Sequence, residues 1–355
     1  MNIKKILTIN PKSDGTKIAV YEHENTIFLK TINHELKGRL DFDDQIKTRT
    51  EDIVKELKDN CIDYKSIGIV MARGGLTKPL KSGIYEINDA MKKDLKSNAR
   101  GHHASNYGAF IADNIAKEIH SAKAYISDPA VIDEMDEIAR VSGHPMFKRE
   151  SIFHGLSQKS VARKYAKTNN VKYEDLNLIV VTIRKGVSVS AHRQGKVVDV
   201  NQAYDGNGPF SMERTGSVPP GQLIKLCFSE KLTQEEIEEM ITQKGGLFSY
   251  LGTSNYAEVE EMIENGDKKA AFYYEAFAYQ ISKEIGSMYA VLEGNVDGVV
   301  FSGDIFYSGT FTEMVKKRVE NIAPISVYPH EFQMDALANN AMMIIREECE
   351  ILEYK

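Results

Sequence analysis

Hydrophobic and polar positions near the N-terminus follow a pattern typical of β-strands. Short runs of apolar and β-branched residues occur at 6–9, 17–21 and 26–29, and a polar turn from Asn10 to Gly15 separates the first two. Runs of this length and composition, bounded by turn residues, predict strands joined as a meander. The chain is therefore expected to open with three consecutive strands.

A second stretch repeats this order of elements. Runs at 178–181, 187–191 and 196–200 are separated first by a turn that ends at Gly186 and then by a Gln194-Gly195 turn. The matching order favours two similar domains, each opening with a meander. The alternative interpretation is a mixed α/β chain that contains two unrelated hairpins.

Helices and strands alternate after each meander. Further strands are predicted at 67–71, 124–127, 299–302 and 325–328, and helices at 107–119, 272–291 and 334–350. Thr233 and Glu236 have the spacing of a capping box, which predicts the start of another helix, and Gly245 is predicted to end it. This alternation predicts an α/β fold.

Composition and charge narrow the class of protein. The chain has 355 residues, enough for two domains, and its formal net charge of −6 argues against a nucleic-acid partner. Its three cysteines form no CxxC pair, which indicates neither a zinc site nor a disulfide framework. The N-terminal apolar run is too short for a signal peptide, and no run is long enough to span a membrane. We therefore expect a cytoplasmic protein with no membrane partner.

Several motifs stand in a fixed order along nearly the whole chain. They include Ala72-Arg73-Gly74-Gly75, His103-Ala104-Ser105-Asn106, Ile126-Ser127-Asp128-Pro129, Ser151-Ile152-Phe153-His154-Gly155 and Asp205-Gly206-Asn207-Gly208-Pro209-Phe210. In these motifs and their spacing the chain resembles the butyrate kinases, which belong with acetate kinases in the superfamily of sugar kinases, heat-shock ATPases and actin. The resemblance implies an α/β fold of two duplicated actin-like (ribonuclease H-like) domains around a central nucleotide cleft.

The resemblance also implies domain bounds and an activity. Residues 1–174, joined by the C-terminal helix at about 333–355, would form the N-terminal domain, and residues 175–332 the nucleotide-binding domain. The implied reaction transfers the γ-phosphoryl group of ATP, with Mg²⁺, to butanoate or another short-chain carboxylate and gives an acyl phosphate. Related acyl kinases are homo-oligomers, so a dimer is expected.

Five residues match the catalytic and metal-linked positions of these kinases. By resemblance, Arg73 and Arg214 hold the carboxylate and the phosphoryl group, and His154 supports the phosphoryl oxygens. Asp128 would lie near the metal and the acyl group, and Asn10 near the first phosphate loop and the metal. A guanidinium suits both anions because its planar fork donates two hydrogen bonds at once. The alternative reading is a surface arginine, a core histidine and two turn residues that precede prolines.

The nucleotide loops depart from the pattern of the butyrate kinases. The resemblance assigns nucleotide contacts to Asn10, Ser13, Thr16, Gly186 and Gly303. The loop residues that differ from the butyrate kinase pattern are Lys12, Asp14, Gly15, Arg184, Lys185, Asp304 and Phe306. In addition, Gln333 replaces an acid near the start of the last helix.

Loss of loop glycines matters because glycine permits positive φ and a close approach of the backbone to phosphate. Three interpretations remain open at the level of sequence. In the first, ATP still binds because the new side chains point away from it. In the second, the protein is a catalytically impaired homologue with a binding or regulatory role. In the third, the added positive charges suit another phosphoryl donor, such as pyrophosphate.

Overall fold

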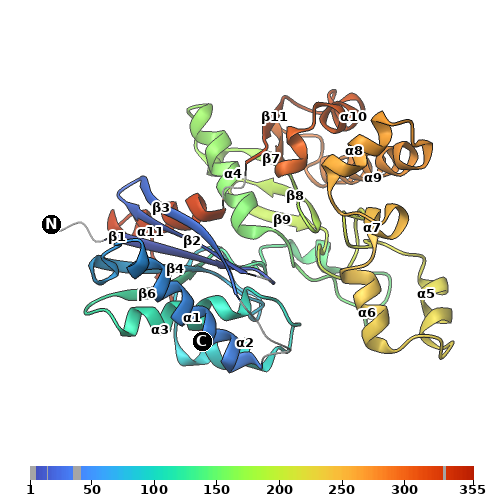
Figure 1. Cartoon of the computed structure of the whole chain (residues 1–355). Helices are drawn as coiled ribbons and strands as arrows, with labels where there is room; N and C mark the ends of the chain where they lie inside the picture. The colour runs from blue at the N-terminus through green and yellow to red at the C-terminus, as the bar shows by residue number, and fades with distance from the viewer. Residues whose placement is uncertain (1–4, 14, 35–40, 331–332) are drawn as a thin grey trace. The chain divides into compact units, whose positions relative to one another are not determined.

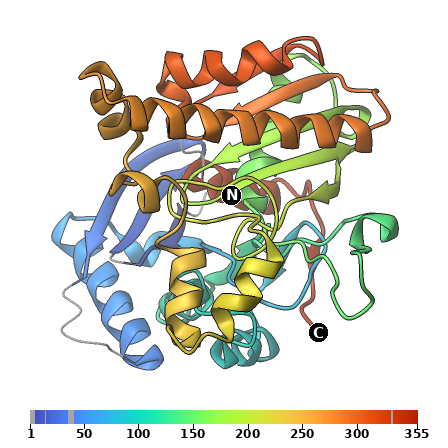
Figure 2. The ribbon, with the colours of Figure 1, turned by 90° about the vertical axis from the view of Figure 1, so that its right-hand side faces the viewer.

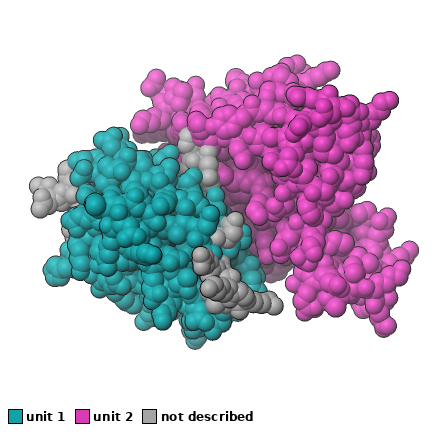
Figure 3. Space-filling model, viewed as in Figure 1, with its two compact units in different colours: residues 1–132, 332–355 teal, residues 133–331 magenta. Residues whose placement is uncertain are grey.

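The chain divides into two compact units, each built around its own mixed β-sheet. The computed structural model describes residues 5–13, 15–34, 41–330 and 333–355. Unit 1 comprises the described residues of 1–132 and 332–355, and unit 2 those of 133–331 (Figure 3).

The sheet of unit 1 has the strand order β12-β5-β6-β4-β1-β2-β3 (Figure 1). Its strands are β1 (Lys5–Pro11), β2 (Gly15–Glu22), β3 (Asn25–Asn33), β4 (Ile67–Arg73), β5 (Ile84–Glu86), β6 (Lys123–Ser127) and β12 (Ile351–Leu352). Strands β1, β4 and β6 are parallel neighbours, whereas β2 and β3 continue from β1 as an antiparallel meander. The predicted N-terminal meander is confirmed.

Helices cover both faces of this sheet. They are α1 (Phe42–Asp59), α2 (Asp89–Ser97), α3 (Asn106–Lys117) and α11 (Gln333–Ile345). Leu7 and Ile9 of β1 share one hydrophobic core with Ile53 of α1 and Ile111 of α3. Because side chains alternate along a strand, Ile6, which precedes Leu7 and is also fully buried, belongs to the opposite face. Helix α11 packs against β1, β2 and β4.

The sheet of unit 2 has the strand order β11-β10-β7-β8-β9. Its strands are β7 (Asn177–Ile183), β8 (Val187–Arg193), β9 (Lys196–Val200), β10 (Gly298–Ser302) and β11 (Ile325–Tyr328). Strands β7, β10 and β11 are parallel, and β7-β8-β9 form an antiparallel meander. This order repeats β6-β4-β1-β2-β3 of unit 1 element for element. The predicted duplication is therefore confirmed.

Helices also cover both faces of the second sheet (Figure 2). They are α4 (Gly155–Thr168), α5 (Pro220–Cys227), α6 (Gln234–Thr242), α7 (Gly246–Leu251), α8 (Tyr256–Glu264), α9 (Lys268–Val291) and α10 (Gly309–Val319). Leu178 and Val180 of β7 face the core that includes α4, and the alternate residues Ile179 and Val181 face the core that includes α9. Across the described ranges, no helix has the length and apolar content needed to cross a bilayer.

The unit boundary differs from the expected domain boundary. Residues 133–174 belong to unit 2, whose strands β7 and β10 pack against α4. The C-terminal helix, expected to run to 350, ends at Ile345 and is followed by the short strand β12.

The predicted capping box of α6 is confirmed, but the predicted end of that helix is wrong. Thr233 and Glu236 form the reciprocal box, and the helix ends at Thr242. Gly245 instead stands before α7 as its N-cap. A Cβ atom there would lie 2.6 Å from the backbone nitrogen of Thr215, so glycine is needed for a close approach of two backbones.

The β8–β9 hairpin offers a test of local turn chemistry. Gln194 and Gly195 both have positive φ, 48° and 82°, as the central residues of a type I′ turn require. We expect Gln194→Asn to raise the free energy of unfolding by about 0.5 kcal/mol, because asparagine tolerates this region better, and Gly195→Ala to lower it by about 1 kcal/mol. Urea denaturation measures both changes. Equal signs for the two variants would contradict the assignment.

Candidate active site

Three predicted site residues lie at one edge of the first sheet. Asn10 is the penultimate residue of β1, Arg73 ends β4, and Asp128 directly follows β6. Because these strands are parallel neighbours, their carboxyl ends meet at the same edge, where α/β proteins bind ligands. Two strand spacings, about 10 Å, separate the backbones of the outer two residues.

Asn10 presents an amide oxygen at this edge. Its side chain is fully buried, and its Nδ2 donates to Oε1 of Gln333 at 2.7 Å. Its Oδ1 is buried and has no hydrogen-bond partner among the described residues. A buried acceptor that the protein leaves unsatisfied suits a hard cation or its water, because Mg²⁺ prefers oxygen ligands. Gln333, at the start of α11, thus orients Asn10 through its neutral amide.

Asp128 is held in an unusual backbone conformation. Its φ of 38° lies in the left-handed region, and the residue is buried. One carboxylate oxygen accepts hydrogen bonds from Ser82 Oγ at 2.6 Å and from the backbone nitrogen of Gly83 at 3.0 Å. The backbone nitrogen of Asp128 donates in turn to the Gly83 carbonyl at 3.0 Å. Such strain costs about 1–3 kcal/mol and persists where several contacts determine the conformation.

A buried arginine that the sequence analysis missed supports the first predicted phosphate loop. Arg49 of α1 is fully buried. Its Nη1 donates to the Gly15 carbonyl at 2.8 Å and to Thr16 Oγ1 at 3.0 Å, and its Nη2 donates to the Ser13 carbonyl at 3.2 Å. Its spacing from Ile46 and Ile53 could have predicted its burial, because all three residues lie on the buried face of α1.

The Thr16 hydroxyl forms its hydrogen bonds inside unit 1. Thr16 is fully buried, and its hydroxyl accepts from Arg49 and donates to Nε2 of His34 at 2.8 Å. Nδ1 of His34 in turn lies 2.6 Å from Asp52. These bonds let the Thr16 side chain stabilise the loop, and the nucleotide contact expected of Thr16 stays a prediction. Ser13 is exposed, as is Lys12, whereas Asp14 lies outside the described residues.

In unit 2, His154 lies at the N-terminus of α4 and contacts β8. Its Nδ1 is 2.7 Å from Oγ of Ser188, and its backbone nitrogen donates to the same oxygen at 3.1 Å. Two residues earlier, the carbonyl of Ile152 accepts from the backbone nitrogen of Ala203 at 2.8 Å. This bond joins the His154 segment to the segment that leads to Arg214.

Arg214 is packed against the loop that follows β7. Its Nη1 donates to the Ala203 carbonyl, and its guanidinium lies 5.1 Å from the ring centroid of Tyr204. Its Nε is buried without a hydrogen-bond partner in the described part of the chain. Burial lowers the pKa of Arg214, an effect that Tyr204 and Glu213 oppose. An arginine remains charged even so, which leaves a desolvated cation with an unused donor.

Both predicted loop glycines of unit 2 are required by close approaches. A Cβ atom at Gly186 would lie 2.5 Å from Nη1 of Arg214. Gly303 has a φ of 123°, and a Cβ atom there would lie 2.1 Å from the Ile183 carbonyl oxygen. The two glycines follow β7 and β10, which are parallel neighbours. The structure thus brings Gly186 together with Arg214, and Gly303 against the end of β7.

The unexpected side chains of unit 2 have definite surroundings. Phe306 is buried and stacks on Phe301 with ring centroids 4.9 Å apart, so it belongs to the hydrophobic core. Lys185 is exposed and pairs with Glu213 at 3.2 Å. Asp304 is exposed. Phe306, one of the loop positions that depart from the butyrate kinase pattern, is thus a core residue of unit 2.

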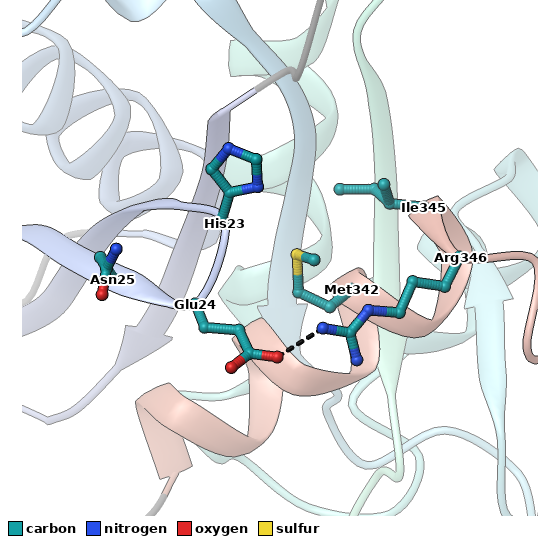
Figure 4. Close-up of a pocket in the computed structure, with 6 residues that line it drawn as sticks. All are labelled: His23, Glu24, Asn25, Met342, Ile345 and Arg346. Atoms are coloured by element: carbon teal, nitrogen blue, oxygen red, sulfur yellow. Dashed lines mark hydrogen bonds and ion pairs between the residues drawn. The ribbon is translucent and has the colours of Figure 1, made fainter. Parts of the chain in front are cut away.

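A surface recess of unit 1 involves none of the predicted site residues. Figure 4 shows its lining, which comes from the β2–β3 turn and from α11: His23, Glu24, Asn25, Met342, Ile345 and Arg346. Glu24 and Arg346 form an ion pair there. Exposed ion pairs of this kind contribute about 0–1 kcal/mol, and we assign the recess no role in catalysis.

The fold is that of short-chain acyl kinases. The crystal structure of Porphyromonas gingivalis acetate kinase matches with a TM-score of 0.80 and 21% identity, over 96% of this chain and 100% of that chain. A propionate kinase from Francisella tularensis subsp. tularensis matches with a TM-score of 0.78 and 17% identity, over 95% and 98%. These likenesses establish the acetate kinase form of the actin-like fold.

Sequence comparison places the chain more closely. Butyrate kinase 2 of Clostridium acetobutylicum is 47% identical over 354 residues, which cover 99% of each chain, and butyrate kinase 1 of the same organism is also 47% identical over 99% of each chain. The model of the acetokinase family matches residues 145–347. The chain belongs to the acetokinase family.

Replacing the buried Arg49 tests its role in supporting the first loop. We expect Arg49→Met to lower the free energy of unfolding by about 3 kcal/mol, because the carbonyls of Ser13 and Gly15 and the hydroxyl of Thr16 all lose a charged donor. The Gly15 carbonyl keeps only the backbone N–H of Lys12. Lys30→Met is the control, since Lys30 of β3 forms a surface ion pair with Glu56 of α1, the helix that carries Arg49. That variant should change stability by less than about 1 kcal/mol. Equal losses for the two variants would contradict a supporting role of Arg49.

His34 predicts a pH dependence of stability. Burial lowers its pKa below the ordinary value of 6.5, although Asp52 opposes the shift. As the pH falls below about 6.5, the unfolded chain takes up a proton that the folded chain resists, so folding weakens. We expect His34→Gln to reduce this loss of stability on acidification. Urea denaturation of both proteins at pH 7.5 and at successively lower pH measures it, and parallel curves would rule out His34 as the cause.

Proposed function

We propose that this protein is an acyl kinase of the butyrate kinase type. It transfers the γ-phosphoryl group of ATP to butanoate or another short-chain carboxylate and releases ADP and an acyl phosphate. Membership of the acetokinase family makes it a carboxylate kinase, and the identity to two butyrate kinases extends over nearly the whole chain. We further propose that it acts in the cytoplasm as a homo-oligomer.

The observation that best supports the proposal is the state of Arg214. Its side chain is partly buried, packs against Gly186 of the second loop and keeps a buried Nε donor without a partner among the described residues. A cation in this state gains strongly from an anion placed against it, and a guanidinium fits phosphoryl and carboxylate oxygens equally.

The chemistry requires charge stabilisation more than proton transfer. A carboxylate oxygen attacks the γ-phosphorus while the bond from that phosphorus to the β–γ bridging oxygen breaks. The nucleophile is already ionised, so no base has to remove a proton. Charge spreads over the equatorial oxygens of the transferring group. In the proposal Arg73 and Arg214 bind these oxygens and the carboxylate, and His154 donates a hydrogen bond to the phosphoryl group.

The proposed metal ligands are Asn10 and Asp128. The unsatisfied Oδ1 of Asn10 and the oriented carboxylate of Asp128 are oxygen donors, which is the ligand type that Mg²⁺ prefers. When bound with the nucleotide, Mg²⁺ neutralises charge on its phosphates. We assign Gln333 to the orientation of Asn10, because it accepts the hydrogen bond of that amide.

The choice of phosphoryl donor is part of the proposal. ATP is favoured because Phe306 packs in the core, and because Gly186 and Gly303 keep the close backbone approaches of their loops. Lys12 in the first loop and Lys185 in the second are exposed positive charges, which is the feature that would suit pyrophosphate. The test therefore compares the two donors directly.

The assay traps acyl phosphate as its hydroxamate, with Mg²⁺, butanoate and either ATP or pyrophosphate. We expect turnover with ATP, and Arg214→Ala should lower kcat/KM by about 10³-fold because a charged donor to the transferring group is lost. Arg318→Ala is the matched control, since Arg318 pairs with Glu275 on the surface and should leave activity unchanged. Turnover with pyrophosphate and not with ATP would show that pyrophosphate is the phosphoryl donor. Binding of butanoate without turnover with either donor would indicate an impaired homologue.

A further inference from the structure

Ser188 makes two contacts with the same residue. It is the second residue of β8 and is fully buried. Its Oγ lies 2.7 Å from Nδ1 of His154 and 3.1 Å from the backbone nitrogen of His154. Both distances are those of good hydrogen bonds.

The donors and acceptors of this pair assign its protons. The backbone N–H of His154 can only donate, so Ser188 Oγ accepts there. The Ser188 hydroxyl carries one proton, and Nδ1 of His154 is the one remaining side-chain or backbone atom within hydrogen-bond distance among the described residues. Buried hydroxyl protons in folded proteins are almost always donated to an acceptor. Nδ1 must therefore be unprotonated, and a neutral His154 carries its proton on Nε2.

We propose that Ser188 is a positioning residue that fixes His154 as the Nε2–H tautomer. This inference rests on the proposed function, in which His154 supports the transferring phosphoryl group. An Nε2–H tautomer donates a hydrogen bond to an anionic oxygen without needing to be an imidazolium, whereas the Nδ1–H tautomer would direct a lone pair at that oxygen.

A second set of contacts holds Ser188 against the helix that carries His154. Gln158 lies one turn further along α4, and its Nε2 donates to the Ser188 carbonyl at 3.0 Å and to the Val180 carbonyl at 3.1 Å. The first turn of α4 is therefore bonded to both β7 and β8. His154 and its serine partner thus belong to one rigid assembly, as a positioning role requires.

Ser190 provides a matched control in the same strand. It lies two residues beyond Ser188 on the same face and is equally buried. Its hydroxyl donates to Oε1 of Gln158 at 2.5 Å and lies 2.8 Å from Nε2 of His192, but it makes no contact with His154 in the described structure. Its loss should disturb packing to a similar extent without changing the tautomer of His154.

The test reads the tautomer from the full-length protein labelled with ¹⁵N-histidine. The ring nitrogen signals of His154, assigned from their loss in His154→Gln, should show a protonated Nε2 and an unprotonated Nδ1. Ser188→Ala should shift these signals towards a mixture of tautomers, Ser190→Ala should leave them unchanged, and Ser188→Thr should restore the wild-type pattern. A protonated Nδ1 in the wild type, or unchanged signals in Ser188→Ala, would overturn the inference even if Ser188→Thr does not fold.

Kinetics separate this inference from the proposed function. We expect Ser188→Ala to lower kcat about tenfold with KM for both substrates changed less than about twofold, because the interaction concerns the transferring group. A Ser188→Ala variant with wild-type kcat would also overturn the positioning role. Full activity of His154→Gln would instead refute the proposed role of His154, and the NMR result would still decide the tautomer.

Discussion

Parallel pairing between the first strand of each meander and its neighbour is the constraint on which the candidate site depends. In unit 1, β1 pairs with β4, and in unit 2, β7 pairs with β10. Parallel neighbours end at the same edge, so every loop that follows them starts within about 5 Å of the next. At Gly303 this approach is so close that no side chain is accommodated. Residues distant in sequence are thereby brought to one edge within each unit.

Buried positive charge is managed in a consistent way in both units. Arg49 donates to carbonyls of the first loop, and Lys159 of α4 pairs with Glu134 at 2.6 Å and donates to the Gly195 carbonyl at 2.7 Å. These two cations are satisfied internally and stabilise the fold. Arg214 differs, because a buried donor of its guanidinium has no partner in the described part of the chain. The contrast separates a structural cation from one suited to bind a ligand.

Local pattern predicted the strands from β-branched runs and turn residues, and it favoured their duplication over two unrelated hairpins. The same local pattern wrongly predicted that Gly245 ends α6. Glycine is needed there because the backbone of Thr215, thirty residues earlier, comes close to it. The sequence also did not predict the direction in which individual side chains point. The nucleotide contact expected of Thr16 stays a prediction, and nothing in the local pattern indicated that its hydroxyl bonds with His34 and Arg49 inside unit 1. Resemblance supplied Arg73, Asp128, His154 and Arg214, whose roles stay predictions.

The grouping of residues 133–174 with unit 2 has a consequence for how such proteins diverge. His154, Ser188 and Arg214 share one compact unit, and the bonds from His154 to Ser188 and from Arg214 to the Ala203 carbonyl lie within it. These three residues and the bonds between their segments can therefore be inherited, duplicated or recombined together as one compact part of the chain.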